Sequence, residues 1–374
     1  SGGEHPTPAI DLAGRLLRRP RGAHTDDAFS IDSDVSLDGL AAVAVENVHV
    51  TNDQIDRHAG RLVPGRKAAG ANSGDDGAVH DIIVIGAGSA GAIIASRASE
   101  DPNRSVLLLD SGPDYPLADD VPDDLLDGTR NSLTDHDWEL GYQPTESGRR
   151  QPFPRGRVTG GSSAVNTTIA LRAVPEDCDD WVAAGCDAWS WDQVLPAFRR
   201  LERDLDFGDE DHHGDAGPIP IRRHPDSELS ELHTAFLDAA DELDWPRCPD
   251  QNHPTDWGAG PQPMNKLGRL RMSAAIGYLA PARIRPNLTI RGNAHVTRLV
   301  LEGRQVVGVE VDGPDGPETV RARLVVLSAG AIHSPGVLVR SGIGRPDELT
   351  HLGIDQVAAA PGVGAGLSDH PALS

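Results

Sequence analysis

The chain has 374 residues, and 57 Asp and Glu residues against 34 Lys and Arg residues give it a formal net charge of −23 at pH 7. This acidity argues against nucleic acid or an anionic membrane as a partner, because both repel a strongly negative protein. Three cysteines without a Cys-x-x-Cys spacing exclude a disulfide framework, and no apolar run reaches membrane-spanning length, so we expect a cytoplasmic protein.

Residues 1–80 differ in composition from the rest of the chain. They are rich in Gly, Asp, Ala and His and show little periodic apolar pattern. We expect this stretch to be a flexible N-terminal extension. A docking or targeting arm built on the basic patch at residues 15–21 is the alternative.

The segment from Asp81 to Gly91 predicts a dinucleotide-binding turn. Its sequence is Asp-Ile-Ile-Val-Ile-Gly-Ala-Gly-Ser-Ala-Gly, an apolar strand that enters a Gly-x-Gly-x-x-Gly turn, and a small-residue helix follows over 90–99. In such a turn Gly86 permits the tight bend, Gly88 lets the backbone approach the pyrophosphate, and Gly91 lets the helix pack closely on the strand. The pyrophosphate would then lie at the positive end of the helix.

A second apolar run, 106–109, ends in Asp110, 24 residues after Gly86. An acidic residue at this distance is placed to bind the adenosine ribose. It therefore favours FAD or NAD over NADP.

The middle of the chain has helical patterns. After a loop-rich stretch, residues 181–202 have helical spacing, and residues 229–243 predict another amphipathic helix. The expected apolar face of the first helix carries Trp191, Val194, Leu195 and Phe198.

Further strands are expected at 287–290, 296–301, 306–311 and 320–327, the last leading into the small-residue turn Ser328-Ala329-Gly330. We therefore predict an α/β fold with a discontinuous Rossmann-like FAD/NAD(P)-binding domain at 81–172 and 287–374. Residues 173–286 would form part of an incomplete α+β substrate or cap domain.

Several ordered motifs resemble the glucose–methanol–choline (GMC) family of FAD oxidoreductases. The first is the glycine–serine loop Gly160-Gly-Ser-Ser-Ala-Val-Asn166, followed by Arg172 and Asp177–Trp181. The others are His213-Gly214 with Gly217-Pro218, Arg271-Met-Ser273, Gly330–Pro335 continuing to Gly344, and Leu367-Ser-Asp-His-Pro371. The resemblance covers nearly everything from residue 81 to residue 371.

The resemblance implies a bound FAD and assigns residues to it. The pyrophosphate would lie at the first turn, the adenosine near the last strand turn, and the flavin near the glycine–serine loop and the Asp-His-Pro segment. The implied cofactor-binding residues are Gly86, Gly88, Ser89, Ala90, Gly91, Asp110, Val158, Gly161, Asn166, Val296, Ala329, Gly330, Asp369 and His370.

Two departures from the family pattern matter. Val165 stands where members with covalent FAD have a histidine, so we predict non-covalent FAD. Ala372 stands where choline-oxidising members have a glutamate, which disfavours choline as the substrate.

The resemblance implies oxidation of a small-molecule alcohol by hydride transfer to flavin N5. The family's catalytic His–His or His–Asn pair comes from a C-terminal part that would follow Pro371, so we expect a second polypeptide to supply it. Within this chain His370 is the only catalytic candidate. The alternatives are a lyase that cleaves cyanohydrins with a redox-silent FAD, and a non-catalytic FAD-binding subunit.

Three other groups of histidines invite attention. The run Asp209-Glu-Asp-His-His213 suggests a metal, but adjacent histidines in an exposed acidic loop rarely converge on one ion, so no metal site is expected. His136 and His333 are expected to be structural.

Overall fold

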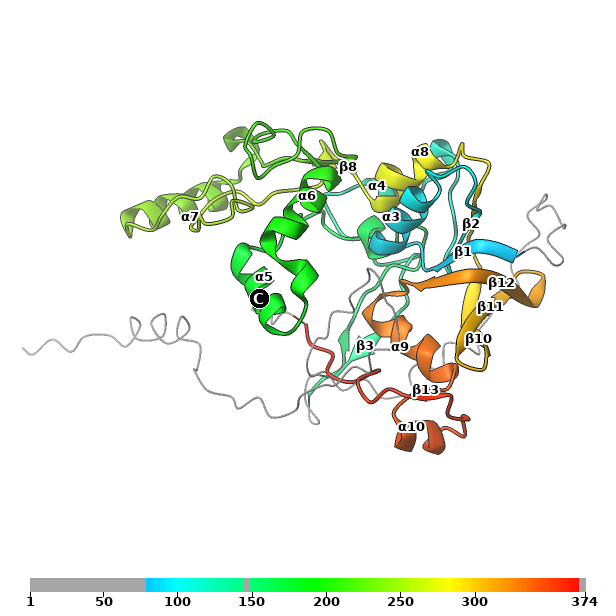
Figure 1. Ribbon diagram of the computed structural model, residues 1–374. Coiled ribbons are helices and arrows are strands. Elements are labelled where there is room, and N and C mark those ends of the chain that lie inside the picture. Colours follow the sequence, from blue (N-terminus) through cyan, green and yellow to red (C-terminus); the bar gives the residue numbers. More distant parts are fainter. Residues whose placement is uncertain (1–78, 144–147, 370–374) are drawn as a thin grey trace, which may run out of the picture. The chain divides into compact units, whose positions relative to one another are not determined.

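The computed structural model describes residues 79–143 and 148–369, and its largest element is a six-stranded mixed sheet (Figure 1). The strand order is β10-β11-β12-β1-β2-β9. The strands are β1 (Val79–Ile85), β2 (Val106–Leu109), β9 (Leu288–Arg291), β10 (His295–Glu302), β11 (Gln305–Gly313) and β12 (Gly316–Leu327). The group β12-β1-β2-β9 is parallel, and β10 and β11 extend it as an antiparallel meander. Two segments far apart in the chain thus build one sheet, which confirms the predicted α/β fold.

The central strands β1 and β2 are buried on both faces, as their uninterrupted apolar sequences predict. The even-numbered residues Ile82 and Val84 share a core cluster with alanines of helix α3 (Ser89–Ala98). The odd-numbered Ile83 and Ile85 belong to a cluster on the other side that includes helix α9 (Gly330–Arg340). Because both faces are covered, the turns at the strand ends are held by a rigid core.

Residues 173–286 differ from the prediction in one respect. The expected single helix over 181–202 is wrong, because α5 (Pro175–Ala183) ends there and α6 (Trp191–Leu201) begins anew. Gly185 lies in the break with a φ of +95°, a left-handed conformation that ends helices and favours glycine. The predicted apolar face of α6 is correct, since its four residues are half-buried, as is Leu201 at the end of the helix. The expected helix over 229–243 is α7 (Glu231–Glu242).

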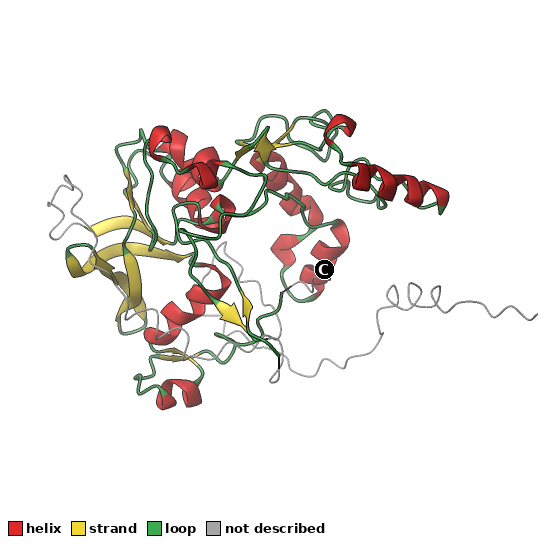
Figure 2. Ribbon diagram, turned by 180° about the vertical axis from the view of Figure 1, so that it is seen from behind, coloured by secondary structure: helices red, strands yellow, loops and turns green. Residues whose placement is uncertain are grey.

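The other elements are short. They are η1 (Ala118–Asp120), α4 (Asp123–Leu126), β3 (Gly141–Tyr142), β4 (Gln151–Pro152), η2 (Gly161–Ala164), η3 (Asp187–Trp189), β5 (Glu202–Asp204), β6 (Ile219–Ile221), η4 (Asp226–Glu228), β7 (Lys266–Leu267), β8 (Leu270–Arg271), η5 (Ala275–Leu279), α8 (Ala280–Ala282), β13 (Ile343–Gly344), α10 (Pro346–His351) and β14 (Ala358–Ala359). Figures 1 and 2 show α7 well apart from the six-stranded sheet. Among the helices of the described residues, none is long and apolar enough to cross a membrane.

The predicted N-terminal extension lies outside the described residues, apart from the first two residues of β1, which begins at Val79. The proposed division into domains at residues 172 and 287 stays a prediction.

Candidate functional site

The turn after β1 uses its three glycines in two ways. Gly86 has a φ of +90°, and a Cβ there would lie 2.6 Å from the carbonyl oxygen of Ser328. A Cβ on Gly91 would lie 1.8 Å from the carbonyl oxygen of Gly86. At Gly88 the nearest protein atom to a Cβ would be the Cα of Gly161, 3.9 Å away. Gly86 and Gly91 are therefore required by packing, whereas Gly88 faces room that the protein does not fill.

The start of α3 is open to an anion. Ser89 and Ala90 form its exposed first turn, and no side chain caps the helix at Gly88. The first N–H groups of a helix have no partner within the helix, and the helix dipole adds positive charge to them. This helix terminus therefore has the electrostatics that a pyrophosphate requires.

The last residues of β1, β2 and β12 are partners in the sheet register, so the turns that follow them meet at one edge. Asp110 follows β2, and the turn from Ser328 to Gly330 follows β12. Gly330 has a φ of +78°, and a Cβ there would meet nothing within 4 Å. Ala329 is half-buried beside it. Ligands of open α/β sheets bind at this edge, outside the carboxyl ends of the strands.

The Asp110 carboxylate holds the turn after β1 by hydrogen bonds. Its Oδ2 accepts a hydrogen bond from the Ala87 N–H, and its Oδ1 accepts one from the Gly112 N–H, both at 2.8 Å. Burial raises the pKa of this carboxyl to about 6, against the lowering effect of the two hydrogen bonds. The carboxylate oxygens retain lone pairs for a further donor, which is what a ribose hydroxyl would supply.

Val296 belongs to strand β10, whose start is bonded to the backbone around Asp110. The Ala294 N–H donates to the Asp110 carbonyl oxygen at 2.8 Å, and the Asn293 N–H donates to that of Gly112 at 2.7 Å. The start of β10 is thereby held against the end of β2. Val296 itself is buried two residues further on.

The glycine–serine loop packs directly on the first turn. The Gly160 N–H donates to the Ala87 carbonyl oxygen at 2.8 Å, and a Cβ on Gly161 would lie 2.6 Å from the Cα of Gly88. Val158 is buried in the same loop, while Asn166 is half-buried and its Oδ1 accepts from the Thr168 N–H at 3.0 Å. The structure thus brings together two motifs that are about 70 residues apart in the sequence.

Arg271 fixes this loop, a role that the sequence did not reveal. Its guanidinium is fully buried and donates to the backbone carbonyl oxygens of Ala164, Asp127 and Arg130, at 2.7 Å for the first and the last. Burial lowers its pKa, and the nearby carboxylates Asp124 and Asp127 oppose that effect. One side chain therefore ties the glycine–serine loop to residues 124–130. The sequence shows only an arginine in an Arg-x-Ser motif.

The C-terminal segment reaches the same region through Asp369. Its Oδ2 lies 3.2 Å from Nη2 of Arg155, at the exposed surface. A Cβ on the next residue, Gly156, would lie 2.3 Å from the Gly161 carbonyl oxygen, so this part of the chain abuts the glycine–serine loop. His370 and Ala372 lie outside the described residues, and the roles expected of them stay predictions.

The expected structural histidines have protein partners. His136 shares a 2.8 Å hydrogen bond with the Tyr115 hydroxyl. The ring of His333 packs against Trp138 with centroids 4.1 Å apart.

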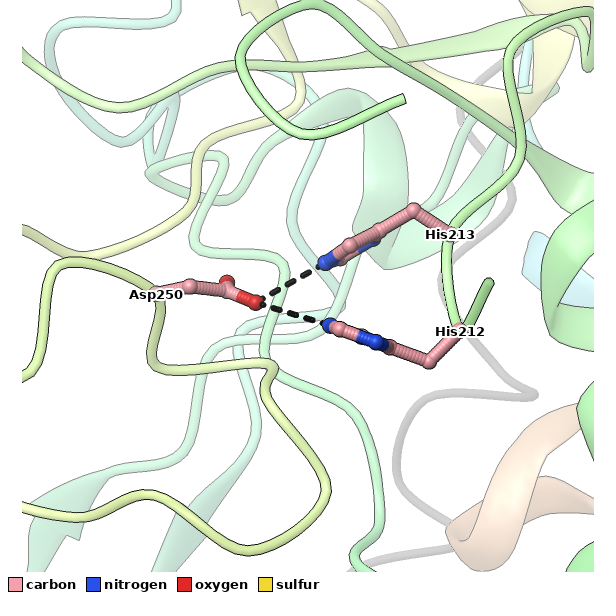
Figure 3. A group of neighbouring side chains, drawn as sticks. All are labelled: His212, His213 and Asp250. Carbon is pink, nitrogen blue, oxygen red and sulfur yellow. Dashed lines mark hydrogen bonds and ion pairs between the residues drawn. The ribbon is translucent and has the colours of Figure 1, made fainter. Parts of the chain in front are cut away.

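The pair His212–His213 does not lie in an exposed loop, so that part of the prediction is wrong. His213 is fully buried, and the Nε2 atoms of both rings point at one oxygen of Asp250 (Figure 3), at 2.8 Å for His213 and 3.5 Å for His212. The Nδ1 of His213 lies 2.8 Å from Oε1 of Glu202, and Arg223 pairs with the other oxygen of Asp250. Because these groups already neutralise one another, we interpret the cluster as a buried ion-pair network and not as a metal site.

The arrangement as a whole fits a dinucleotide. Open space lies beside Gly88 and Gly330, an uncapped helix faces it, and Asp110 stands where a ribose is expected. Backbone groups and small side chains dominate the site. Such a site binds and orients a cofactor, and leaves the redox chemistry to that cofactor.

Comparison with known proteins agrees with this assignment. The family model described as GMC oxidoreductase matches residues 80–372. The chain is 38% identical over 309 residues to a 5-(hydroxymethyl)furfural oxidase of Methylovorus sp. (strain MP688), covering 79% of this chain and 58% of that protein. It is 40% identical over 298 residues to an oxygen-dependent choline dehydrogenase of Staphylococcus saprophyticus, covering 78% of this chain and 52% of that protein.

Among solved structures, the pyridoxine 4-oxidase of Mesorbium loti matches with a TM-score of 0.69 and 36% identity, over 75% of this chain and 55% of that one. The chain therefore spans a little over half the length of the relatives that it matches.

Proposed function

Because this chain belongs to the GMC oxidoreductase family, whose cofactor is FAD, we propose that it forms the FAD-binding part of an enzyme that oxidises a small-molecule alcohol. The observation that carries the proposal is the meeting of the first turn, Asp110 and the glycine–serine loop at one sheet edge. The names of three relatives support an alcohol substrate, since hydroxymethylfurfural, choline and pyridoxine each carry a primary alcohol.

In the proposed reaction, the residues of this chain bind FAD and orient it. When bound, FAD supplies a hydride acceptor for the alcohol carbon. The α3 terminus and Asp110 would hold the dinucleotide, and the loop fixed by Arg271 would position the flavin. The alcohol proton needs a base near neutral pKa, for which histidine is suited.

We place that base outside the described residues. His136, His213 and His333 contact other side chains of the protein, and the family resemblance places His370 by the flavin ring, so His370 is the candidate within this chain. The principal base would come from a region equivalent to the part of the relatives' length that this chain does not match.

Flavin bleaching tests the function. We expect the chain, reconstituted with FAD and co-expressed with the region of the Methylovorus oxidase that lies outside the match, to lose flavin absorbance anaerobically when pyridoxine or hydroxymethylfurfural is added. The chain alone should bind FAD without bleaching, because we propose that the base lies in that added region. Full bleaching by the chain alone would place the base within it. Cyanohydrin cleavage without bleaching would identify a lyase instead.

Acid precipitation tests the mode of FAD attachment. Val165 is buried in the glycine–serine loop and has no nucleophilic atom, so we expect all of the flavin to remain in the supernatant after the holoprotein is precipitated with trichloroacetic acid. Absorbance of the supernatant and the redissolved pellet measures the two fractions. Flavin that stays in the pellet would show a covalent bond at some other residue.

A further inference from the structure

The Asp110 carboxylate is bonded to two separate parts of the proposed FAD site. Its Oδ2 accepts from the Ala87 N–H in the turn before α3, and its Oδ1 accepts from the Gly112 N–H after β2. The Gly160 N–H of the glycine–serine loop donates to the carbonyl oxygen of the same Ala87. A change at this one carboxylate therefore affects the pyrophosphate turn as well as the expected ribose contact.

The ionised carboxylate is the form that suits this arrangement. An ionised carboxylate only accepts hydrogen bonds, and its two oxygens offer about four lone-pair sites. The N–H groups of Ala87 and Gly112 take two of these sites, and the others remain for a ribose hydroxyl. A proton on Asp110 would occupy one of the remaining sites and turn it into a donor. The proton and the ribose hydroxyl therefore compete for the same lone pairs.

The surroundings of Asp110 make it easy to protonate. Burial raises the pKa of its carboxyl to about 6 from an ordinary value of 3.8, and the negative charge of Asp114, which is paired with Arg283, acts in the same direction. The two N–H donors and the exposed Arg157 oppose this rise. The first two turns of α3 carry no charged side chain. The free chain should therefore take up a proton at Asp110 in mildly acidic solution.

The histidines of this region would give the opposite pH dependence. The Nδ1 of His295, at the start of β10, lies 2.8 Å from the Ser111 hydroxyl, and burial together with nearby arginines lowers the pKa of this ring. His333, in the first turn of α9, packs its ring against Trp138. Protonation of either ring would add positive charge, which favours an anionic cofactor at low pH. Loss of FAD at low pH therefore points to a carboxylate.

We propose that FAD and a proton compete for the Asp110 carboxylate, so that in mildly acidic solution each FAD that binds expels one proton to the solvent. The inference rests on the proposed function, because it concerns the FAD site of that enzyme. Above about pH 6, where Asp110 is already ionised in the free chain, FAD affinity should not depend on this group. Below it, affinity should fall about tenfold for each pH unit, because one proton must leave.

Fluorescence titration of the full-length apoprotein with FAD between about pH 5 and 8 measures the competition. The wild type should show a constant Kd at the upper end and a Kd that rises about tenfold per unit below the bend. Asp110→Asn should bind FAD more weakly at neutral pH and show no such rise, because an amide does not titrate. Any titration of FAD itself would appear equally in both proteins. Far-UV circular dichroism at each pH checks that the apoprotein stays folded.

Two further measurements do not depend on Asp110→Asn. Calorimetric titration of the wild type in two buffers of different ionisation enthalpy counts the protons released, and one pH unit below the bend we expect close to one per FAD. Arg157→Gln should move the bend to higher pH, because it removes the exposed charge that favours the ionised carboxyl. Arg345→Gln is the matched control, since Arg345 is an exposed arginine paired with Asp347, and its bend should stay in place.

Three results would overturn the inference. They are a Kd of the folded wild type that does not change over this pH range, tighter binding at the acidic end, and an equal slope in Asp110→Asn. Failure of the folded wild type to bind FAD at any pH would reject the proposed function itself.

Discussion

Gly88→Ala is expected to weaken FAD binding at least tenfold while the apoprotein keeps its stability. A Cβ at this position would have its nearest protein neighbour 3.9 Å away, an ordinary van der Waals distance, so the fold can accept it. The space it fills is the space beside the open α3 terminus, where the pyrophosphate backbone contact is expected. A loss of about 1.4 kcal/mol or more in binding corresponds to this tenfold change. Fluorescence titration of apoprotein with FAD measures it.

Two substitutions in the same experiment separate binding from folding. Gly91→Ala should lower the urea midpoint of the apoprotein, because its Cβ would lie 1.8 Å from the Gly86 carbonyl oxygen and α3 would have to move. Gly313→Ala in the β11–β12 hairpin should leave the urea midpoint unchanged, since its Cβ meets nothing closer than 3.9 Å. If Gly88→Ala binds FAD like the wild type, the pyrophosphate does not lie at this turn.

The features that could be predicted from the sequence are those encoded by neighbouring residues. The glycine turn and the strands over 82–85 and 106–109 were recognisable because a buried parallel strand needs a continuous apolar run. The later strands were equally recognisable from their apolar alternation. The predicted loops also meet, because parallel strands place their ends at one edge.

The missed features depend on residues far apart in the sequence. The local sequence gives no sign that Arg271 is buried. Its hydrogen-bond acceptors, the carbonyl oxygens of Ala164 and Arg130, are more than 100 residues away in the chain. His213 reads as part of an exposed acidic run, yet it is buried because Asp250 closes over it. Helix α7 was predicted as an amphipathic helix over 229–243, but no local pattern indicates whether its apolar side has a partner.

Arg223→Met should destabilise the protein by roughly 3–5 kcal/mol, because it removes one partner from a buried ion-pair network. The guanidinium pairs with Asp204 and Asp250, and all three side chains are buried. Loss of the guanidinium leaves the buried carboxylates of Asp204 and Asp250 with one positive charge fewer to compensate them. Urea unfolding followed by tryptophan fluorescence measures the effect. The control is Arg247→Met, whose ion pair with Asp241 is exposed, and its unfolding midpoint should hardly move. Similar losses in both variants would show that burial of the network carries no special weight.

The same network should make stability depend on pH through His213. Both of its ring nitrogens lie 2.8 Å from carboxylate oxygens, which only accept hydrogen bonds, so both nitrogens must donate and the ring must be charged. Burial opposes that charge, but the hydrogen bonds to Asp250 and Glu202 outweigh it and raise the pKa to about 9.

A folded-state pKa above the unfolded value of 6.5 means that the stabilisation is complete below pH 6.5 and is lost as the pH rises through about 9. Arg172 also belongs to the network, since its Nη1 lies 3.3 Å from Oε1 of Glu202. Arg172 and Arg223 stay charged in this range. Burial together with His213 lowers the pKa of the adjacent His212, so neither the arginines nor His212 supplies the same slope. We therefore expect the free energy of unfolding of the wild type to fall between pH 6.5 and 9.

His213→Gln should be less stable than the wild type at pH 6.5, because its neutral amide cannot donate to both carboxylates or balance their charge. Its free energy of unfolding should hardly change between pH 6.5 and 9. His224→Gln, at a partly exposed pair with Glu228, should keep the wild-type slope. Equal slopes in the wild type and His213→Gln would mean that the buried ring is neutral. Arg172 and Arg223 would then supply the positive charge that faces the carboxylates Glu202, Asp204 and Asp250.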